Sequence, residues 1–161
     1  NGKYIVQQCL PLATYKERPF DVRVSVQLGS AGEWQITGYV AKAASKSRFL
    51  TNLAQGGKVH RLEDILQEEY PHLNPRKVVR DISELALRIA DHLGQHLPDL
   101  ADLGMDIGLT VDGFPMFIEC NGKDQRYSFR EAGMLDVWKA SYENPMAYAK
   151  YLLTRRMESQ L

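Results

Sequence analysis

The sequence predicts an α+β fold in which a largely antiparallel sheet packs against helices. Three observations lead to this fold class. Residues 20–28 alternate between apolar and polar side chains, which is typical of a strand that buries one face. Asp112 and Gly113 lie between two mostly apolar runs, as in a β-hairpin. Asn74 and Pro75 precede apolar residues at helical spacing, which indicates the start of a long helix.

The composition is that of a globular domain. The 161 residues are 44% hydrophobic, so the chain can bury a substantial core, and we expect one domain over residues 1–161. Lysine plus arginine and aspartate plus glutamate number 20 each, so the net charge does not favour nucleic acid or an anionic membrane. No apolar run reaches the roughly 20 residues that span a bilayer, and no secretory signal is visible. We therefore expect a cytoplasmic protein.

The chain opens with strand composition at residues 4–10, which end before Pro11. Gln7 and Gln8 interrupt this strand and are either solvent-facing glutamines or ligand contacts. Because the strand starts so soon after the first residue, which is not methionine, we expect the chain to be an excised part of a longer protein. Cys9 and Cys120 lie in predicted strands without metal-binding or disulfide spacing, so buried free thiols are expected.

Residues 20–28 and 34–42 form the next two strands, joined by a glycine-containing turn. A long polar loop, residues 43–58, follows and ends in Gly56 and Gly57. Glycine pairs let backbone amides approach a ligand, although most of them mark plain turns. Helices are expected at residues 62–70, 75–97 and 128–140, and a fourth is expected to start at Asn144 and Pro145.

The hairpin carries the most informative polar residues. If Asp112 and Gly113 are its two loop residues, Asp106 lies directly opposite Glu119, and strand alternation places Asn121 on the same face. Two carboxylates and an amide oxygen would suit Mg²⁺, Mn²⁺ or Ca²⁺. Alternatively, Asp106 pairs with a lysine, Glu119 is solvated and Asn121 belongs to the turn that ends the strand.

The order of the polar motifs resembles the C-terminal part of ATP-grasp ligases of the glutathione-synthetase type. The motifs are the paired glutamines, Asp21-x-Arg23, Lys42, the loop from Phe49 to Gly57, and the polar residues of the hairpin. The sequence looks most like the endospore coat-associated ATP-grasp family, over residues 4–127. This resemblance implies an ATP-grasp C-terminal subdomain.

The resemblance also implies a role for each matching residue. Residues Gln7, Gln8, Cys9 and Leu10 match the strand that contacts adenine and ribose, and Gly56 and Gly57 match the loop over the nucleotide. Arg23, Lys42 and Asn52 match catalytic positions at the phosphates and the acyl-phosphate intermediate, although the family more often has arginine at the position of Lys42. Asp106, Glu119 and Asn121 match the magnesium ligands.

The implied function is that of an ATP-binding, Mg²⁺-dependent carboxylate-amine ligase, with Mn²⁺ as a compatible substitute. ATP, a carboxylate and an amine would be its partners. Because the first ATP-grasp subdomain does not precede residue 4, we expect the isolated chain to hold one wall of the nucleotide cleft and to be inactive alone. The alternative is a non-catalytic structural or interaction protein of the spore coat, with other coat proteins as partners.

Overall fold

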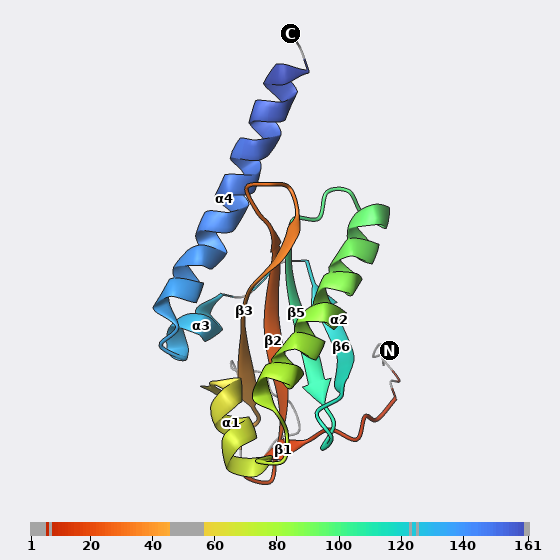
Figure 1. The fold of residues 1–161 in the computed structure, drawn as a ribbon, viewed down its shortest axis with the longest axis vertical. Helices are drawn as coiled ribbons and strands as arrows, with labels where there is room; N and C mark the ends of the chain where they lie inside the picture. Colours follow the sequence, from red (N-terminus) through yellow and green to blue (C-terminus); the bar gives the residue numbers. More distant parts are fainter. Residues whose placement is uncertain (1–5, 7, 46–56, 123, 125, 160–161) are drawn as a thin grey trace, which may run out of the picture.

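The computed structural model describes residue 6 and residues 8–45, 57–122, 124 and 126–159 (Figure 1). Its strands and helices in chain order are β1 (Thr14–Tyr15), β2 (Arg18–Leu28), β3 (Trp34–Ala43), β4 (Lys58–His60), α1 (Leu62–Glu69), α2 (Pro75–His96), β5 (Asp102–Leu109), β6 (Pro115–Asn121), α3 (Tyr127–Glu131) and α4 (Leu135–Glu158). Five strands form an antiparallel sheet in the order β4-β3-β2-β5-β6, and β1 pairs with β2. The predicted α+β class is confirmed.

Strand β2 lies at the centre of the sheet and separates two different faces. Its valines, Val22, Val24 and Val26, face the apolar core that α1 and α2 cover. The opposite face carries Asp21 and Arg23 and is buried as well, so the predicted half-exposed strand is wrong. Charged side chains tolerate this depth only when they are paired with one another.

The β5–β6 hairpin has a different turn from the predicted one but the expected pairing. Its loop contains three residues, 111–113, and the Gly113 N–H donates to the Thr110 carbonyl at 2.9 Å. Gly113 has φ +77°, a conformation that glycine adopts without strain. A bulge between Asp106 and Ile107 then shifts the register by one residue, so that Asp106 still pairs with Glu119.

The long helix α2 begins as the sequence predicts. The Asn74 side chain accepts hydrogen bonds from the backbone N–H groups of Arg76 and Lys77, and Pro75 occupies the first turn. Its buried residues pack on the apolar face of the sheet. Cys120 packs against the same core, whereas Cys9 is exposed, so the expected burial is wrong for Cys9. The described part of the predicted first strand, residue 6 and residues 8–10, is not in a strand.

Helices α3 and α4 lie on the polar face of the sheet (Figure 1). Gly38 of β3 permits close approach of α4, because a Cβ atom there would lie 2.2 Å from the Val137 side chain. Helix α4 is continuous through Pro145, so the predicted helix start at Asn144 is wrong. Among the described residues, no helix combines the length and the apolar character that crossing a membrane requires.

The carbonyl of Ser141 explains how α4 accommodates Pro145. Proline has no N–H, so it cannot donate to the carbonyl four residues earlier, which costs about 3 kcal/mol in a helix interior. Here the Ser141 oxygen accepts instead from Gln27 Nε2 at 2.8 Å and Arg126 Nε at 2.9 Å. The proline therefore frees a carbonyl that attaches α4 to the sheet.

We expect Pro145→Ala to raise the free energy of unfolding by less than about 1 kcal/mol, well below the roughly 3 kcal/mol of an uncompensated helix proline. The reason is that Gln27 and Arg126 already satisfy the Ser141 carbonyl. Urea denaturation of both proteins gives the difference. A gain near 3 kcal/mol would show that the two side chains do not compensate for the missing hydrogen bond.

Candidate functional site

The sheet register assembles a row of charged residues on the polar face. Arg23 of β2 pairs with Asp106 of β5, and Asp106 pairs with Glu119 of β6. In the adjacent row, Asp21 of β2 pairs with Lys42 of β3. Directly paired residues, and residues two positions apart on a strand, share one face of a sheet. Residues from four strands thus meet at one place.

Asp106 is the centre of this cluster. Its Oδ1 lies 2.7 Å from Arg23 Nε and its Oδ2 lies 3.1 Å from Arg23 Nη2, so the guanidinium binds it through two parallel hydrogen bonds. Lys42 Nζ lies 2.9 Å from Asp106 Oδ1 and 3.1 Å from Asp21 Oδ1. Burial by itself would raise the pKa of Asp106, but the hydrogen bonds and charges of Arg23 and Lys42 hold it below the ordinary value.

Asp124 extends the cluster on the far side of Arg23. Its Oδ1 lies 3.4 Å from Arg23 Nη1, and its side chain is completely buried. Burial raises the pKa of the Asp124 carboxyl above its ordinary value, and the neighbouring Ser25 hydroxyl and the Arg23 charge offset this only in part. Gly104 leaves the necessary room, because a Cβ atom there would lie 2.7 Å from Asp124 Oδ1. Arg23 is thus held between two carboxylates.

Glu119 and Asn121 lie at the solvent-accessible rim of the cluster. Glu119 is exposed on β6, and Asn121 Nδ2 donates to Glu119 Oε1 at 3.3 Å, which leaves the Asn121 amide oxygen as an acceptor. With Asp106, these residues supply hard oxygen donors on one face, which fit Mg²⁺ or Mn²⁺ in type. A group of three His, Cys, Asp or Glu residues placed to hold a metal does not occur among the described residues, so the fit depends on Asn121.

The described residues include only some of the predicted nucleotide contacts, and they do not include the predicted catalytic residue Asn52. Gln7, Asn52 and Gly56 lie outside the described residues. Gln8 and Cys9 are exposed, and Leu10 is half-buried.

The segment that follows Leu10 reaches the polar face of the sheet. A side chain at Gly108 would collide with Leu12, and Gly108 is two positions from Asp106 on the same face. Leu12 therefore lies on the same face as the charged cluster. Gly57, in contrast, directly precedes β4 at the edge of the sheet.

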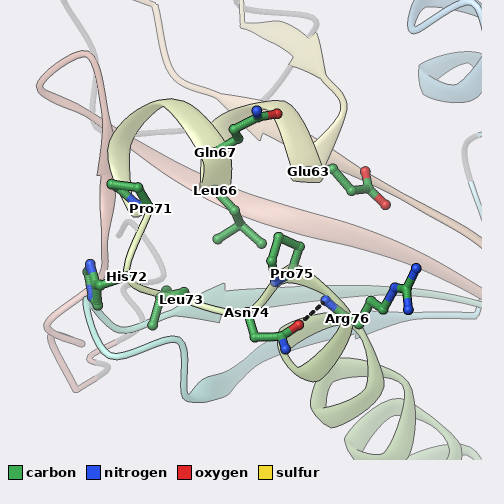
Figure 2. A pocket seen from close by; sticks show the side chains of 9 residues that line it. All are labelled: Glu63, Leu66, Gln67, Pro71, His72, Leu73, Asn74, Pro75 and Arg76. Atoms are coloured by element: carbon green, nitrogen blue, oxygen red, sulfur yellow. Dashed lines mark hydrogen bonds between the residues drawn. The ribbon is translucent and has the colours of Figure 1, made fainter.

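A pocket lies at the junction of α1 and α2 (Figure 2). Its volume is about 750 Å³, and its lining residues are Glu63, Leu66, Gln67, Pro71, His72, Leu73, Asn74, Pro75 and Arg76. The helices that form it cover the apolar face of the sheet, opposite the charged cluster. Asn74 already caps α2 there, and Glu63 accepts from the Tyr39 hydroxyl. The polar side chains of Asn74 and Glu63 therefore stabilise the fold.

Comparisons with known proteins point to one family. The family described as YheC/D like ATP-grasp matches residues 1–152. The chain is 24% identical over 157 residues to the endospore coat-associated protein YheD of Bacillus subtilis (strain 168). The matched region covers 97% of this chain and 34% of YheD. It is also 24% identical over 156 residues to YheC of the same organism, covering 97% of this chain and 42% of YheC. The chain thus spans less than half the length of these relatives.

Proposed function

This chain belongs to the YheC/D-like ATP-grasp family, and from that premise we propose that it forms one wall of a Mg²⁺-ATP site in a carboxylate-amine ligase. The observation that carries the proposal is the convergence of Arg23 and Lys42 on Asp106, beside Glu119 and Asn121. Cations and oxygen donors on one face match what a triphosphate and its metal require. The family and the fold support ATP use, while the reaction is our inference.

The residues of this chain would act mainly by positioning charge. Asp106 fixes the guanidinium of Arg23 by two hydrogen bonds, so Arg23 is oriented before any ligand arrives. Lys42, held by Asp21 and Asp106, adds a point charge at the same place. Attack of a carboxylate on a γ-phosphate brings anions together, and these two cations would offset their repulsion. The attack would break the bond between the β- and γ-phosphates, releasing ADP and forming an acyl phosphate. An amine would then attack the acyl carbon, lose a proton and displace phosphate, leaving an amide.

The metal would be held by Asp106, Glu119 and Asn121. When bound, it would neutralise part of the negative charge of the phosphates. Asp106 already accepts three hydrogen bonds from Arg23 and Lys42, so it would share its carboxylate with these cations. Glu119 is exposed and Asn121 half-buried, so these two side chains can be changed with little effect on packing.

We expect the double variant Glu119→Ala/Asn121→Ala to weaken Mg²⁺-dependent ATP binding by about tenfold or more, because two of three oxygen ligands are lost. Calorimetric titration of the full-length protein and its variant with ATP, in the presence of Mg²⁺, Mn²⁺ or a chelator, measures this effect. Glu84→Ala, which removes an exposed carboxylate from α2, is the matched control and should bind normally. Equal affinity in the double variant and the wild type would refute the ligand assignment.

The relatives favour a second candidate, a non-catalytic component of the spore coat. Both are named as endospore coat-associated proteins. The buried contacts of Lys42 with Asp21 and Asp106 also satisfy a purely structural role. Full-length wild-type protein that binds no ATP with either metal in the same titration would favour this candidate over the ligase. Spore association of this chain is part of either proposal.

A further inference from the structure

Helix α4 is apolar on two opposite faces. One face packs on the sheet, where Val137 contacts Gly38, Asn144 hydrogen-bonds with Thr37, and Tyr151 lies against Gly32. The opposite face carries a second row of apolar side chains. A helix that buries only one face shows apolar residues on one stripe, so apolar residues on two faces indicate two packing partners.

We define the outer stripe as Leu135, Tyr142, Met146, Leu153 and Met157. These five side chains are between 52% and 71% exposed. Successive helical residues are about 100° apart, so the five positions fall within an arc of about 60°, and they extend over about 33 Å. Figure 1 shows α4 at the edge of the molecule, with its C-terminal half projecting beyond the sheet. The outer stripe is therefore accessible along its whole length.

We propose that a second copy of this chain covers the outer stripe, with the two α4 helices packed antiparallel around Met146. The distribution of charges along α4 favours a second, antiparallel copy as the partner. Its first half, residues 135–146, carries two acidic residues and one basic residue, whereas residues 147–158 carry three basic residues and one acidic residue. An antiparallel pair brings each half beside the oppositely charged half of the other copy.

Two residues at the border of the outer stripe make the arrangement specific. Glu143 and Lys150 lie on the same side of the stripe, about 20° apart around the helix axis. When Met146 meets Met146 of the second copy, Glu143 lies next to Lys150 of that copy, and the reciprocal contact forms by symmetry. A parallel pair would instead place these two residues of one copy on the opposite side of the contact from those of the other copy, so they would not meet.

The resulting dimer is a stack of sheet, α4, α4 of the second copy and the second sheet. The helix pair would thus separate the two sheets. A single helix pair provides a contact near the roughly 1,000 Å² at which specific interfaces begin, so we expect association at concentrations of about 10 μM. The charged cluster around Asp106 takes no part, so the dimer and the proposed ATP site can fail independently.

Sedimentation velocity of the protein from 1 to 200 μM tests the proposal. The mass should rise from 18.3 kDa toward twice that value with concentration. Met146→Glu, at the centre of the outer stripe, should weaken association at least tenfold, because it brings the new carboxylates of the two copies together in an apolar contact. Thr154→Glu, an exposed residue about 80° around the helix from Met146, should associate like the wild type. Circular dichroism checks that each variant keeps its helix content.

A charge exchange tests the antiparallel register. Glu143→Lys and Lys150→Glu should each weaken association about fivefold, since each turns two attractive contacts into repulsive ones. The double variant Glu143→Lys/Lys150→Glu should recover the wild-type constant within about twofold. A double variant as weak as the single ones overturns the register. A monomer at every concentration overturns the proposal and leaves the outer stripe to another partner or to another segment of a longer polypeptide.

Discussion

Replacing Asp106 by alanine should lower the free energy of unfolding by about 3–5 kcal/mol, one of the two largest effects that we expect in this protein. Asp106 accepts two hydrogen bonds from Arg23 and one from Lys42, and all three side chains are buried. Without the carboxylate, two buried cations lose their shared partner. Guanidinium denaturation of the variant and the wild type at pH 7 measures the loss.

Glu119→Ala is the matched control for this prediction. Glu119 pairs directly with Asp106 across the hairpin and is the second proposed carboxylate ligand of the same metal, but it is exposed. Its removal should change the free energy of unfolding by less than about 0.5 kcal/mol. A loss below about 0.5 kcal/mol in Asp106→Ala as well would mean that the ion pairs of Asp106 contribute little to the stability. A large difference would also mean that Asp106 variants are unsuitable for testing metal binding.

The register of the hairpin was predictable from sequence, but only because two deviations cancel. The Asp112-Gly113 pair predicts a glycine at positive φ, which both a two-residue and a three-residue loop can use. The actual loop contains one residue more, and the bulge near Ile118 restores the pairing of Asp106 with Glu119. Neither the loop length nor the bulge has a distinctive local sequence, so sequence could not distinguish the two turns.

The burial of the charged cluster was not predictable from local patterns. Alternation places Asp21 and Arg23 on the polar face of a strand, and such a face is usually solvated. It is buried here because Arg23 meets Asp106, 83 residues away, and because α4 covers the neighbouring part of the sheet. Asp124 follows the last strand and belongs to no periodic pattern, so only the structure places it beside Arg23. The proline signal at Pro145 failed for a similar reason, because a distant Gln27 compensates for it.

The second large effect should follow Arg23→Met, which removes the cation between Asp106 and Asp124. We expect a loss of about 3–5 kcal/mol in the free energy of unfolding at pH 7.5, because Asp124 becomes a buried charge without a counter-ion. Asp106 keeps Lys42 as a counter-ion, so most of the loss in the free energy of unfolding should come from Asp124. The loss should therefore depend on the protonation state of that carboxyl.

The expected pH dependence has a definite sign. Burial already raises the pKa of Asp124 in the folded protein, and removal of Arg23 raises it further above the unfolded value near 3.9. A raised carboxyl pKa costs stability above the folded pKa, and the cost is relieved as the pH falls through it. The difference between Arg23→Met and wild type should thus be smaller at pH 5 than at pH 7.5.

The double variant Arg23→Met/Asp124→Asn separates this explanation from a simple packing defect. An uncharged amide in place of the Asp124 carboxylate needs no counter-ion, so the double variant should be more stable at pH 7.5 than Arg23→Met alone, and its difference from wild type should lose most of its pH dependence. Denaturation curves at both pH values for the wild type, the two single variants and the double variant give the free energies for a double-mutant cycle. If Asp124→Asn restores no stability to Arg23→Met, the 3.4 Å contact between Arg23 and Asp124 does not hold the buried carboxylate, and Arg23 serves Asp106 alone.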